Sequence, residues 1–386
     1  MSTQPHFEAD GVAGLSSLFI HDIPLLDVRA PIEFQRGAFP TACNLPLLDD
    51  EERRQVGIRY KQAGQEAAIA LGEQLVSGSI RQQRIDQWCN FITQNPDAKL
   101  YCFRGGLRSK TVQQWLQAEG IAIQRVEGGY KQLRRYLIDS LDRSASSQRF
   151  IVVAGKTGCG KTHLLEELPS SFDLEGRANH RGSAFGRRVH EQPSQIDFEN
   201  HVSIDLLKIC QHSPKQIFVE DESRAIGSLS VPHLLHKRMS ESPLAVIEQK
   251  LEERVQVILN DYILANFDDF KTSYEHTHFQ MFAEFLRQSL SRIRRRLGDD
   301  SFSEIAQAMD DAINLHEQNG ETVHHANWIA PLLTRYYDPM YEYQLDKKSD
   351  RIVFRGDRNE FLAWASHLTT HDSAQTPNQI QNQNKQ

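Results

Sequence analysis

Short apolar runs alternate with longer amphipathic stretches through the first third of the chain. The apolar runs predict strands at residues 18–29, 42–46, 99–101 and 121–126. Between them, residues 80–92 place Ile85, Trp88, Cys89 and Ile92 at the i, i+3, i+4, i+7 spacing of a helix with one apolar face. Strands that alternate with helices favour a parallel sheet that is covered by helices on both faces.

The second half of the chain starts with the same alternation and then becomes helical. Apolar runs at residues 150–154 and 216–224 predict two further strands. Helical patterns follow at residues 198–210, 242–265 and 279–297, and Ser301-x-x-Glu304 is a capping box that starts another helix. Five arginines between Arg287 and Arg296 predict either a solvated basic helix end or a patch for RNA phosphates.

Length and composition are those of a globular protein. The chain has 386 residues, of which 39% are hydrophobic and 25% charged, and no run approaches the roughly 18 apolar residues of a membrane helix. The N-terminus lacks the basic and apolar regions of a secretion signal. Five cysteines without a C-x-x-C pair argue against a zinc site and against a disulfide scaffold, and they favour the cytoplasm. With a net charge of −7, any nucleic-acid contact must use a local basic patch.

A glycine-rich segment follows the apolar run at residues 150–154. It reads Gly155-Lys-Thr-Gly158-Cys-Gly160-Lys161-Thr162, which is the spacing G-x-x-x-x-G-K-T, and a helical pattern comes next. A strand, a glycine turn and a helix in this order direct backbone N–H groups and a helix N-terminus at an anion. Lys161 would reach the outer phosphate, and Thr162 would hold a magnesium ion if one is used. We therefore predict a phosphate ligand at this loop.

The loop at residues 174–186 is a candidate for a second contact with that ligand. It contains three glycines and carries His180 and Arg181, with too little periodicity for a helix or a strand. A basic pair beside a phosphate site is a natural clamp. The alternative is a solvated loop without a ligand.

The strand predicted at residues 216–224 ends in acidic residues, in the position of a Walker B element. Glu220 or Asp221 could order a magnesium ion or a water molecule there, and Arg224 could contact the ligand. The sequence does not choose between the two acids.

A second chemical centre lies where the strand at residues 99–101 meets a helix, in the segment Cys102-Phe-Arg104-Gly-Gly-Leu-Arg108-Ser109. Its two glycines permit a tight curl in which backbone N–H groups and the helix N-terminus point at the sulfur and favour the thiolate. Arg104 and Arg108 add positive charge and can hold an oxyanion by bidentate hydrogen bonds. A lone cysteine is more often a buried structural residue, but these neighbours indicate that Cys102 is a nucleophile or a group carrier.

Several segments of the first third together resemble a rhodanese domain. They are Asp27-Val-Arg29, Glu33-Phe34, Gly37-Ala-Phe-Pro40, Asn44-Leu-Pro46, the Cys102 loop and Gly128-Gly129. The resemblance implies that Cys102 carries sulfur or selenium as a persulfide or perselenide. Five residues separate Cys102 from Arg108, where ordinary sulfurtransferases have four, and this wider loop is similar to that of rhodanese-like phosphatases. We therefore hypothesise that the loop admits a tetrahedral anion and meets a phosphate-bearing chalcogen donor.

Over about residues 15–365, the chain resembles the bacterial tRNA 2-selenouridine synthase family. The matching segments are residues 101–109, 155–162, 174–186, 219–224 and 336–341. The resemblance implies a tRNA partner with 2-thiouridine at the wobble position, and selenophosphate supplied by selenophosphate synthetase. It also implies two steps, S-geranylation by geranyl diphosphate and then replacement of the geranylated sulfur by selenium. On this resemblance the glycine-rich loop holds the diphosphate and Cys102 delivers selenium, while no residue pattern locates the ten-carbon chain.

We therefore expect an α/β protein in which a rhodanese-like parallel-sheet domain precedes a P-loop NTPase-like α/β domain with C-terminal helices. The expected boundaries are residues 1–140 for the first domain, 141–148 for a linker, 149–300 for the P-loop domain, 301–368 for a helical and aromatic extension, and 369–386 for a disordered tail. The alternative function is an ATP- or GTP-dependent kinase or NTPase with a regulatory rhodanese module. A non-catalytic tRNA-binding or sulfur-relay protein is a further alternative.

Overall fold

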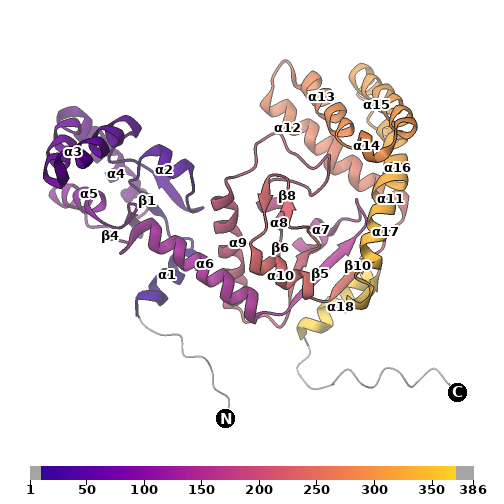
Figure 1. The fold of residues 1–386 in the computed structure, drawn as a ribbon, viewed down its shortest axis with the longest axis horizontal. Helices are drawn as coiled ribbons and strands as arrows, with labels where there is room; N and C mark the ends of the chain where they lie inside the picture. The colour runs from indigo at the N-terminus through magenta and orange to yellow at the C-terminus, as the bar shows by residue number, and fades with distance from the viewer. Residues whose placement is uncertain (1–9, 371–386) are drawn as a thin grey trace, which may run out of the picture.

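Two parallel sheets organise residues 10–370, which are the residues described by the structure, a computed structural model. The first sheet has the order β2 (Ala42–Asn44), β1 (Leu25–Asp27), β3 (Lys99–Tyr101) and β4 (Gln124–Arg125). The second has the order β11 (Ile352–Gly356), β10 (Leu244–Ile247), β5 (Phe150–Gly155), β7 (Ile217–Glu220) and β6 (Ser171–Phe172). Neighbouring strands are parallel throughout both sheets. Figure 1 shows them in two lobes.

Helices account for most of both lobes. Those of the first lobe are α1 (Asp10–Ile20), α2 (Pro31–Gln35), α3 (Asp50–Leu75), α4 (Gly78–Gln94), α5 (Leu107–Ala118) and α6 (Gly129–Ser147). The second sheet is accompanied by α7 (Lys161–Glu166), α8 (Leu174–Arg177), α9 (Gln195–Gln211), α10 (His233–Glu241), α17 (Asp338–Asp346), α18 (Arg358–Thr370) and the short antiparallel pair β8 (Ala225–Ile226) and β9 (Leu229–Ser230). Within residues 10–370, no helix is both long and apolar enough to cross a membrane.

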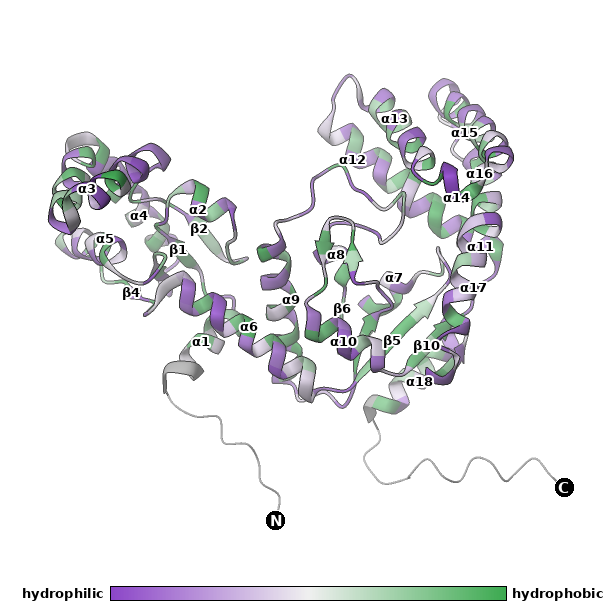
Figure 2. Cartoon of the chain, viewed as in Figure 1, coloured by the Kyte–Doolittle hydropathy of each residue, from purple (hydrophilic) through white to green (hydrophobic). Residues whose placement is uncertain are grey.

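The remaining helices form an extension of the second lobe, which the upper right of Figure 1 shows. They are α11 (Leu251–Ile258), the π-helical turn η1 (Leu259–Leu264), α12 (Ala265–Ser273), α13 (His278–Ser291), α14 (Arg294–Leu297), α15 (Asp299–Asn319), α16 (Ala326–Leu332) and the π-helical turn η3 (Leu333–Tyr337). Figure 2 shows that hydrophobic and hydrophilic residues alternate around α13 and α15. Their apolar faces meet in one buried cluster that includes Phe282, Leu286, Ile305 and Met309.

The structure confirms an α/β fold with parallel sheets, and it corrects several predicted elements. Leu18 and Phe19 belong to α1 and not to a strand. Asp22, with a left-handed φ of 51°, lies between that helix and β1. The run predicted as one helix at residues 242–265 begins with β10, whose four residues are all buried in the sheet. Short apolar runs of this kind do not distinguish a buried strand from a helix. The edge strand β11 lies in the region where the sequence predicts helices and aromatic residues.

Helix α6 joins the two lobes. The linker predicted at residues 141–148 lies mostly within this helix, which continues to Ser147, and β5 begins at Phe150. Its side packs against α9, where Arg134 pairs with Glu199 and donates to Asn200 Oδ1 (2.8 Å). Asn200 in turn donates to the carbonyl of Ala38 in the first lobe (2.6 Å). The two lobes therefore share a packed, hydrogen-bonded interface. The predicted domain boundaries stay predictions, and residues 371–386 of the predicted tail lie outside the described residues.

A buried ion pair anchors the first sheet. Asp27 at the end of β1 and Arg29 are 0% and 1% exposed, and Arg29 Nη2 lies 2.6 Å from Asp27 Oδ2. Arg29 also donates to the carbonyl of Gly37 (2.9 Å), and its guanidinium carbon lies 3.9 Å from the centre of the Tyr130 ring. The pair thus ties the end of β1 to the start of α6.

We expect Arg29→Ala to lower the free energy of unfolding by about 3–5 kcal/mol, because it leaves the Asp27 carboxylate buried without its partner. The matched control is Arg135→Ala, which removes an arginine from the exposed i,i+4 pair with Asp139 and should cost less than about 1 kcal/mol. Chemical denaturation of both variants measures the difference. Equal losses of unfolding free energy in the two variants would show that burial does not increase the contribution of the Asp27–Arg29 pair to stability.

Candidate functional site

The glycine-rich loop connects the end of β5 to the start of α7. Gly158 and Gly160 have φ values of 84° and 73°, in the left-handed region that favours glycine. A Cβ atom on Gly158 would lie 2.8 Å from the carbonyl oxygen of Arg254 in α11. A Cβ atom on Gly155 would lie 2.4 Å from Cys159 Sγ, which is buried inside the loop. Side chains at Gly155 and Gly158 would therefore push the loop away from its support.

Lys161 and Thr162 are the first two residues of α7. Lys161 Nζ donates to the carbonyl of Gly155 (3.2 Å), and Thr162 Oγ1 donates to Glu220 Oε1 (2.8 Å). Burial disfavours the charge on Lys161, but the charges of Cys159 and of three nearby glutamates outweigh it and raise the pKa of Lys161. The lysine therefore stays a cation at the place where an anion would bind.

Three glutamates surround this lysine. Burial raises the pKa of Glu175 and of Glu220 well above the ordinary value, and neighbouring acids add to both shifts. Burial, with the charge of Glu220, also raises the pKa of Glu222 to about 7. Gly182 lies against two of these acids, since a Cβ atom there would come within 2.4 Å of Glu175 Oε1 and 3.0 Å of Glu222 Oε1. The acids hold protons more readily than surface glutamates do.

Of the two acids that the sequence left open, the structure brings Glu220 to the loop. Glu220 ends β7 and is fully buried, and its second oxygen accepts from the backbone N–H of Glu175 (3.2 Å). Asp221 instead accepts from Lys348 Nζ (2.7 Å). Adjacent residues of an extended chain project to opposite sides, so only one of the two can meet Thr162. A ligand contact by Asp221 stays a prediction.

The predicted clamp residues His180 and Arg181 and the predicted ligand contact Arg224 lie in three different settings. His180 is buried beside the cleft between the loop at residues 179–192 and α13. Its Nδ1 has no hydrogen-bond partner among the residues that the structure describes. Arg181 donates to Asn266 Oδ1 in α12 (2.7 Å), and its guanidinium lies 5.0 Å from the centre of the Tyr262 ring. Arg224 is exposed next to β8. Arg181 therefore connects its loop to helices of the extension. Ligand contacts by His180, Arg181 and Arg224 stay predictions.

Two residues that the sequence reasoning missed support the phosphate loop. Arg254 in α11 is 3% exposed and donates from Nε to the carbonyl of Thr157 (2.9 Å). Its guanidinium also forms a bidentate pair with Asp338 (2.5 and 3.0 Å). Asp338 lies in the aromatic segment 336–341, but no spacing in the sequence links it to Arg254, 84 residues earlier. This pair holds the loop from the side of the helical extension.

The cysteine loop rests on the N-terminus of α6. The Cys102 side chain is buried, and its thiol donates to Ser109 Oγ (3.3 Å). The backbone N–H groups of Tyr130 and Lys131 donate to the carbonyls of Cys102 (2.9 Å) and Phe103 (3.0 Å). A Cβ atom on Gly129 would lie 2.1 Å from the carbonyl oxygen of Cys102. The Gly128-Gly129 turn is therefore required for this close approach of the loop to α6.

The two arginines of the cysteine loop differ in their surroundings. Arg108 Nη1 lies 2.5 Å from Glu33 Oε2. Burial alone would raise the pKa of Glu33. The hydrogen bond and the charge of Arg108, together with the charge of Arg53, outweigh this effect and lower the pKa of Glu33. Arg104 is exposed beside the loop. Arg125, which the sequence reasoning did not single out, donates to the carbonyl of Gly105 (2.9 Å) and supports the curl. Arg104 is thus the loop arginine that is open to an approaching anion.

Strand β5, the glycine loop with Lys161 and Thr162, and the acid on the neighbouring strand β7 define a P-loop domain. The model of the tRNA 2-selenouridine synthase AAA domain matches residues 148–372. A tRNA 2-selenouridine synthase from Marinobacter nauticus is 48% identical over 92% of this chain and 97% of its own length. The one from Pseudomonas syringae pv. syringae is 48% identical over 92% of this chain and 98% of its own length. The chain belongs to the tRNA 2-selenouridine synthase family.

A solved structure also matches part of the chain. It is the N-terminal domain of a protein from Clostridium difficile 630 that is described as binding ATP or GTP, with 32% identity over 30% of this chain and 89% of its own. Its TM-score of 0.28 is too low to bear on the fold.

The raised pKa of Glu222 predicts a pH-dependent stability. Between its ordinary value of 4.5 and about 7, the folded protein binds more protons than the unfolded chain, so stability falls as the pH rises through this window. We expect Glu222→Gln to raise the free energy of unfolding at pH 8.5 by about 1–3 kcal/mol, and to bring no gain at pH 4. Glu317→Gln, at an exposed position of α15, is the control. An equal gain in the free energy of unfolding of Glu222→Gln at pH 4 and at pH 8.5 would contradict the raised pKa of Glu222.

Proposed function

We propose that this protein converts 2-thiouridine at the wobble position of tRNA to 2-selenouridine in two steps. In the first, the thiocarbonyl sulfur is geranylated by geranyl diphosphate; in the second, selenium from selenophosphate replaces the geranylated sulfur. Membership of the tRNA 2-selenouridine synthase family supports the overall conversion. The observation that carries the first step is the half-buried Lys161, whose pKa is raised, in a glycine loop with the spacing that binds phosphates.

The first step needs help with its leaving group. The sulfur attacks C1 of geranyl diphosphate, the C1–O bond breaks, and negative charge develops on the departing diphosphate. Lys161 and the N–H groups at the start of α7 are fixed before the reaction and would stabilise that charge where it appears. Alkylation in turn makes the sulfur a better leaving group for the second step. The order of the two steps thus follows from the chemistry of the thiocarbonyl.

The residues around Thr162 also fit a magnesium ion. Its hydroxyl and the carboxyl of Glu220 are hard oxygen donors 2.8 Å apart. Within residues 10–370 no group of three or more His, Cys, Asp or Glu side chains could hold a metal unaided. The ion would therefore take its other ligands from phosphate oxygens and water, as magnesium commonly does. When bound, it would add positive charge beside the diphosphate.

Cys102 and its loop suit the second step. The loop opens towards solvent at Arg104, whose planar guanidinium can hold a tetrahedral anion such as selenophosphate by two hydrogen bonds. The carbonyls of Cys102 and Phe103 are already bound by α6, so the loop keeps its shape without a ligand. The Cys102 thiol would lie beside the selenium donor as it delivers selenium to the nucleobase: the selenium of selenophosphate bonds to C2 of the base, the C2–S bond breaks and geranyl thiol leaves, and water then cleaves the Se–P bond to release phosphate.

A large cleft in the second lobe is the best candidate for the tRNA contact. It has a volume of about 830 Å³ and lies between the loop at residues 179–192 and helices α12 and α13. Arg187, Arg188 and Arg292 supply positive charge, while Tyr274 and Phe285 supply rings for stacking. Of the arginines near the end of α13, those at positions 287 and 294 are paired with Asp310 and Asp299. Arg292, which lines the cleft, and the exposed Arg295 and Arg296 are the arginines of the predicted patch that we propose for contact with RNA.

The two loops can be tested separately by following nucleosides from the tRNA with mass spectrometry. Lys161→Ala should slow formation of S-geranyl-2-thiouridine at least about 100-fold, as expected for the loss of a fixed positive charge at the leaving group. Cys102→Ala should allow geranylation and accumulate S-geranyl-2-thiouridine without 2-selenouridine. Cys89→Ala, which removes a partly buried cysteine of α4, is the control and should behave as the wild type.

Loss of geranylation in Cys102→Ala would contradict this division of labour. Unchanged modification in both Lys161→Ala and Cys102→Ala would instead support a non-catalytic protein. Hydrolysis of ATP that requires Lys161, without any use of geranyl diphosphate, would favour the NTPase alternative.

A further inference from the structure

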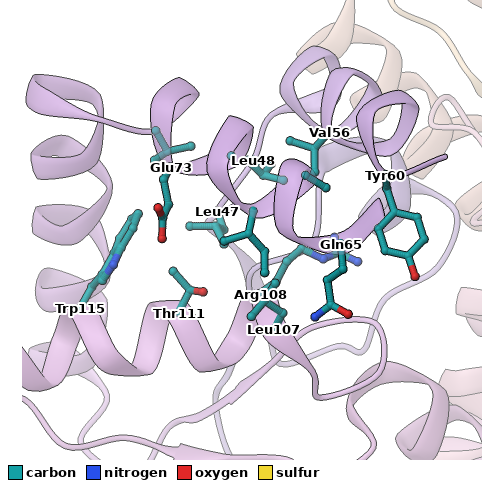
Figure 3. A pocket seen from close by; sticks show the side chains of 14 residues that line it. Leu47, Leu48, Val56, Tyr60, Gln65, Glu73, Leu107, Arg108, Thr111 and Trp115 are labelled. Atoms are coloured by element: carbon teal, nitrogen blue, oxygen red, sulfur yellow. The ribbon is translucent and has the colours of Figure 1, made fainter. Parts of the chain in front are cut away.

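An apolar groove lies beside the cysteine loop and has no part in the steps described so far. Helix α3 is interrupted at Gly64, where φ is 81° and ψ is −172°, so that its second arm folds back towards α5. The space between the two arms of α3 and α5 forms a groove of about 270 Å³ (Figure 3). Its lining includes Val56, Tyr60, Ile69 and Trp115.

The groove is continuous with the loop that holds the reactive thiol. Leu107 and Arg108 belong to the cysteine loop and also line the groove, and Figure 3 shows both below the arms of α3. Cys102 itself contacts Ser109, the next residue of α5 (3.3 Å). Leu107 is 49% exposed and Tyr60 is 57% exposed, although both are large apolar side chains. An exposed apolar surface next to a reactive site is typical of ligand recognition.

The volume of the groove sets the size of the chain that it can hold. A protein cavity of about 150 Å³ takes up benzene, which corresponds to about 25 Å³ per carbon atom. Ten carbon atoms then need about 250 Å³, close to the 270 Å³ of this groove. The apolar cavity that reaches the phosphate loop at Thr157 is much smaller, about 20 Å³. Of these two cavities, the one beside the cysteine loop is large enough for a ten-carbon chain.

We infer that the groove between α3 and α5 binds the geranyl chain of the S-geranylated nucleoside while selenium replaces its sulfur. This inference rests on the proposed function, because it assigns a place to the intermediate of that reaction. The chain enters the groove along Leu107, which brings the nucleobase against the cysteine loop. Gln65 and Arg108 lie near Leu107 in Figure 3 and would face the nucleoside end of the ligand, while Glu73 lies near Trp115 at the other end of the groove. The groove then also receives the geranyl thiol that leaves.

A groove-filling substitution tests the site. Thr111 lies on α5 and points into the groove in Figure 3, so Thr111→Phe should fill it. Ile69→Asp places a charge in it from α3. The control Gln117→Phe adds the same ring to an exposed position of α5 outside the groove. Binding of geraniol, the free ten-carbon alcohol, to the full chain is measured by saturation-transfer NMR. We expect the Kd to rise at least tenfold in the first two variants and to stay unchanged in the control.

The second readout is the rate of each step on tRNA. Thr111→Phe should slow conversion of S-geranyl-2-thiouridine to 2-selenouridine at least tenfold, while geranylation of 2-thiouridine stays within twofold of the wild type. Wild-type behaviour of Thr111→Phe in both steps, equal slowing of both steps, or absence of geraniol binding to the wild type would each overturn the inference. If the wild type does not use geranyl diphosphate but Thr111→Phe still abolishes geraniol binding, the proposed function fails and the groove stands as an apolar ligand site.

Discussion

The packing of helix α6 is the constraint that connects both candidate sites. Its first backbone N–H groups hold the carbonyls of Cys102 and Phe103, and its last residue lies three positions before β5, the strand that ends in the phosphate loop. With 19 residues, α6 extends about 28 Å. Its side is packed against α9 of the second lobe, so it is held at both ends and along its length. A shift of α6 would therefore displace the cysteine loop relative to the phosphate loop.

The two loops stabilise charge by different means. In the phosphate loop, nearby acids raise the pKa of Lys161, and burial in turn raises the pKa of Glu175 and Glu220. In the cysteine loop, Arg104 is exposed, while Arg108 is already paired with Glu33. The first arrangement suits an anion held against a half-buried lysine, and the second suits an anion that approaches an exposed arginine. Because the loops lie in separate lobes, a nucleoside that uses both must move between them (Figure 1).

Local sequence signals were sufficient to locate both loops, but not the residues that support them. The glycines, Lys161 and Thr162 lie within eight consecutive residues, so the motif and the apolar run before it predict a strand, a turn and a helix. Arg254 and Asp338 contact each other across 84 residues, which no periodicity can indicate. Glu220 and Asp221 are equivalent in sequence, and only the direction of each side chain after β7 distinguishes them. The apolar groove likewise depends on how the two arms of α3 fold back, which residue type alone does not determine.

The most direct test of this arrangement is whether one bound tRNA passes from the phosphate loop to the cysteine loop without leaving the protein. Labelled tRNA is bound first, and geranyl diphosphate and selenophosphate are then added together with a large excess of unlabelled tRNA. If α6 holds the two sites for a single bound tRNA, most of the label should appear as 2-selenouridine, with little labelled S-geranyl-2-thiouridine free in solution. Release of labelled S-geranyl-2-thiouridine tRNA, with loss of labelled 2-selenouridine in proportion to the competitor, would contradict it.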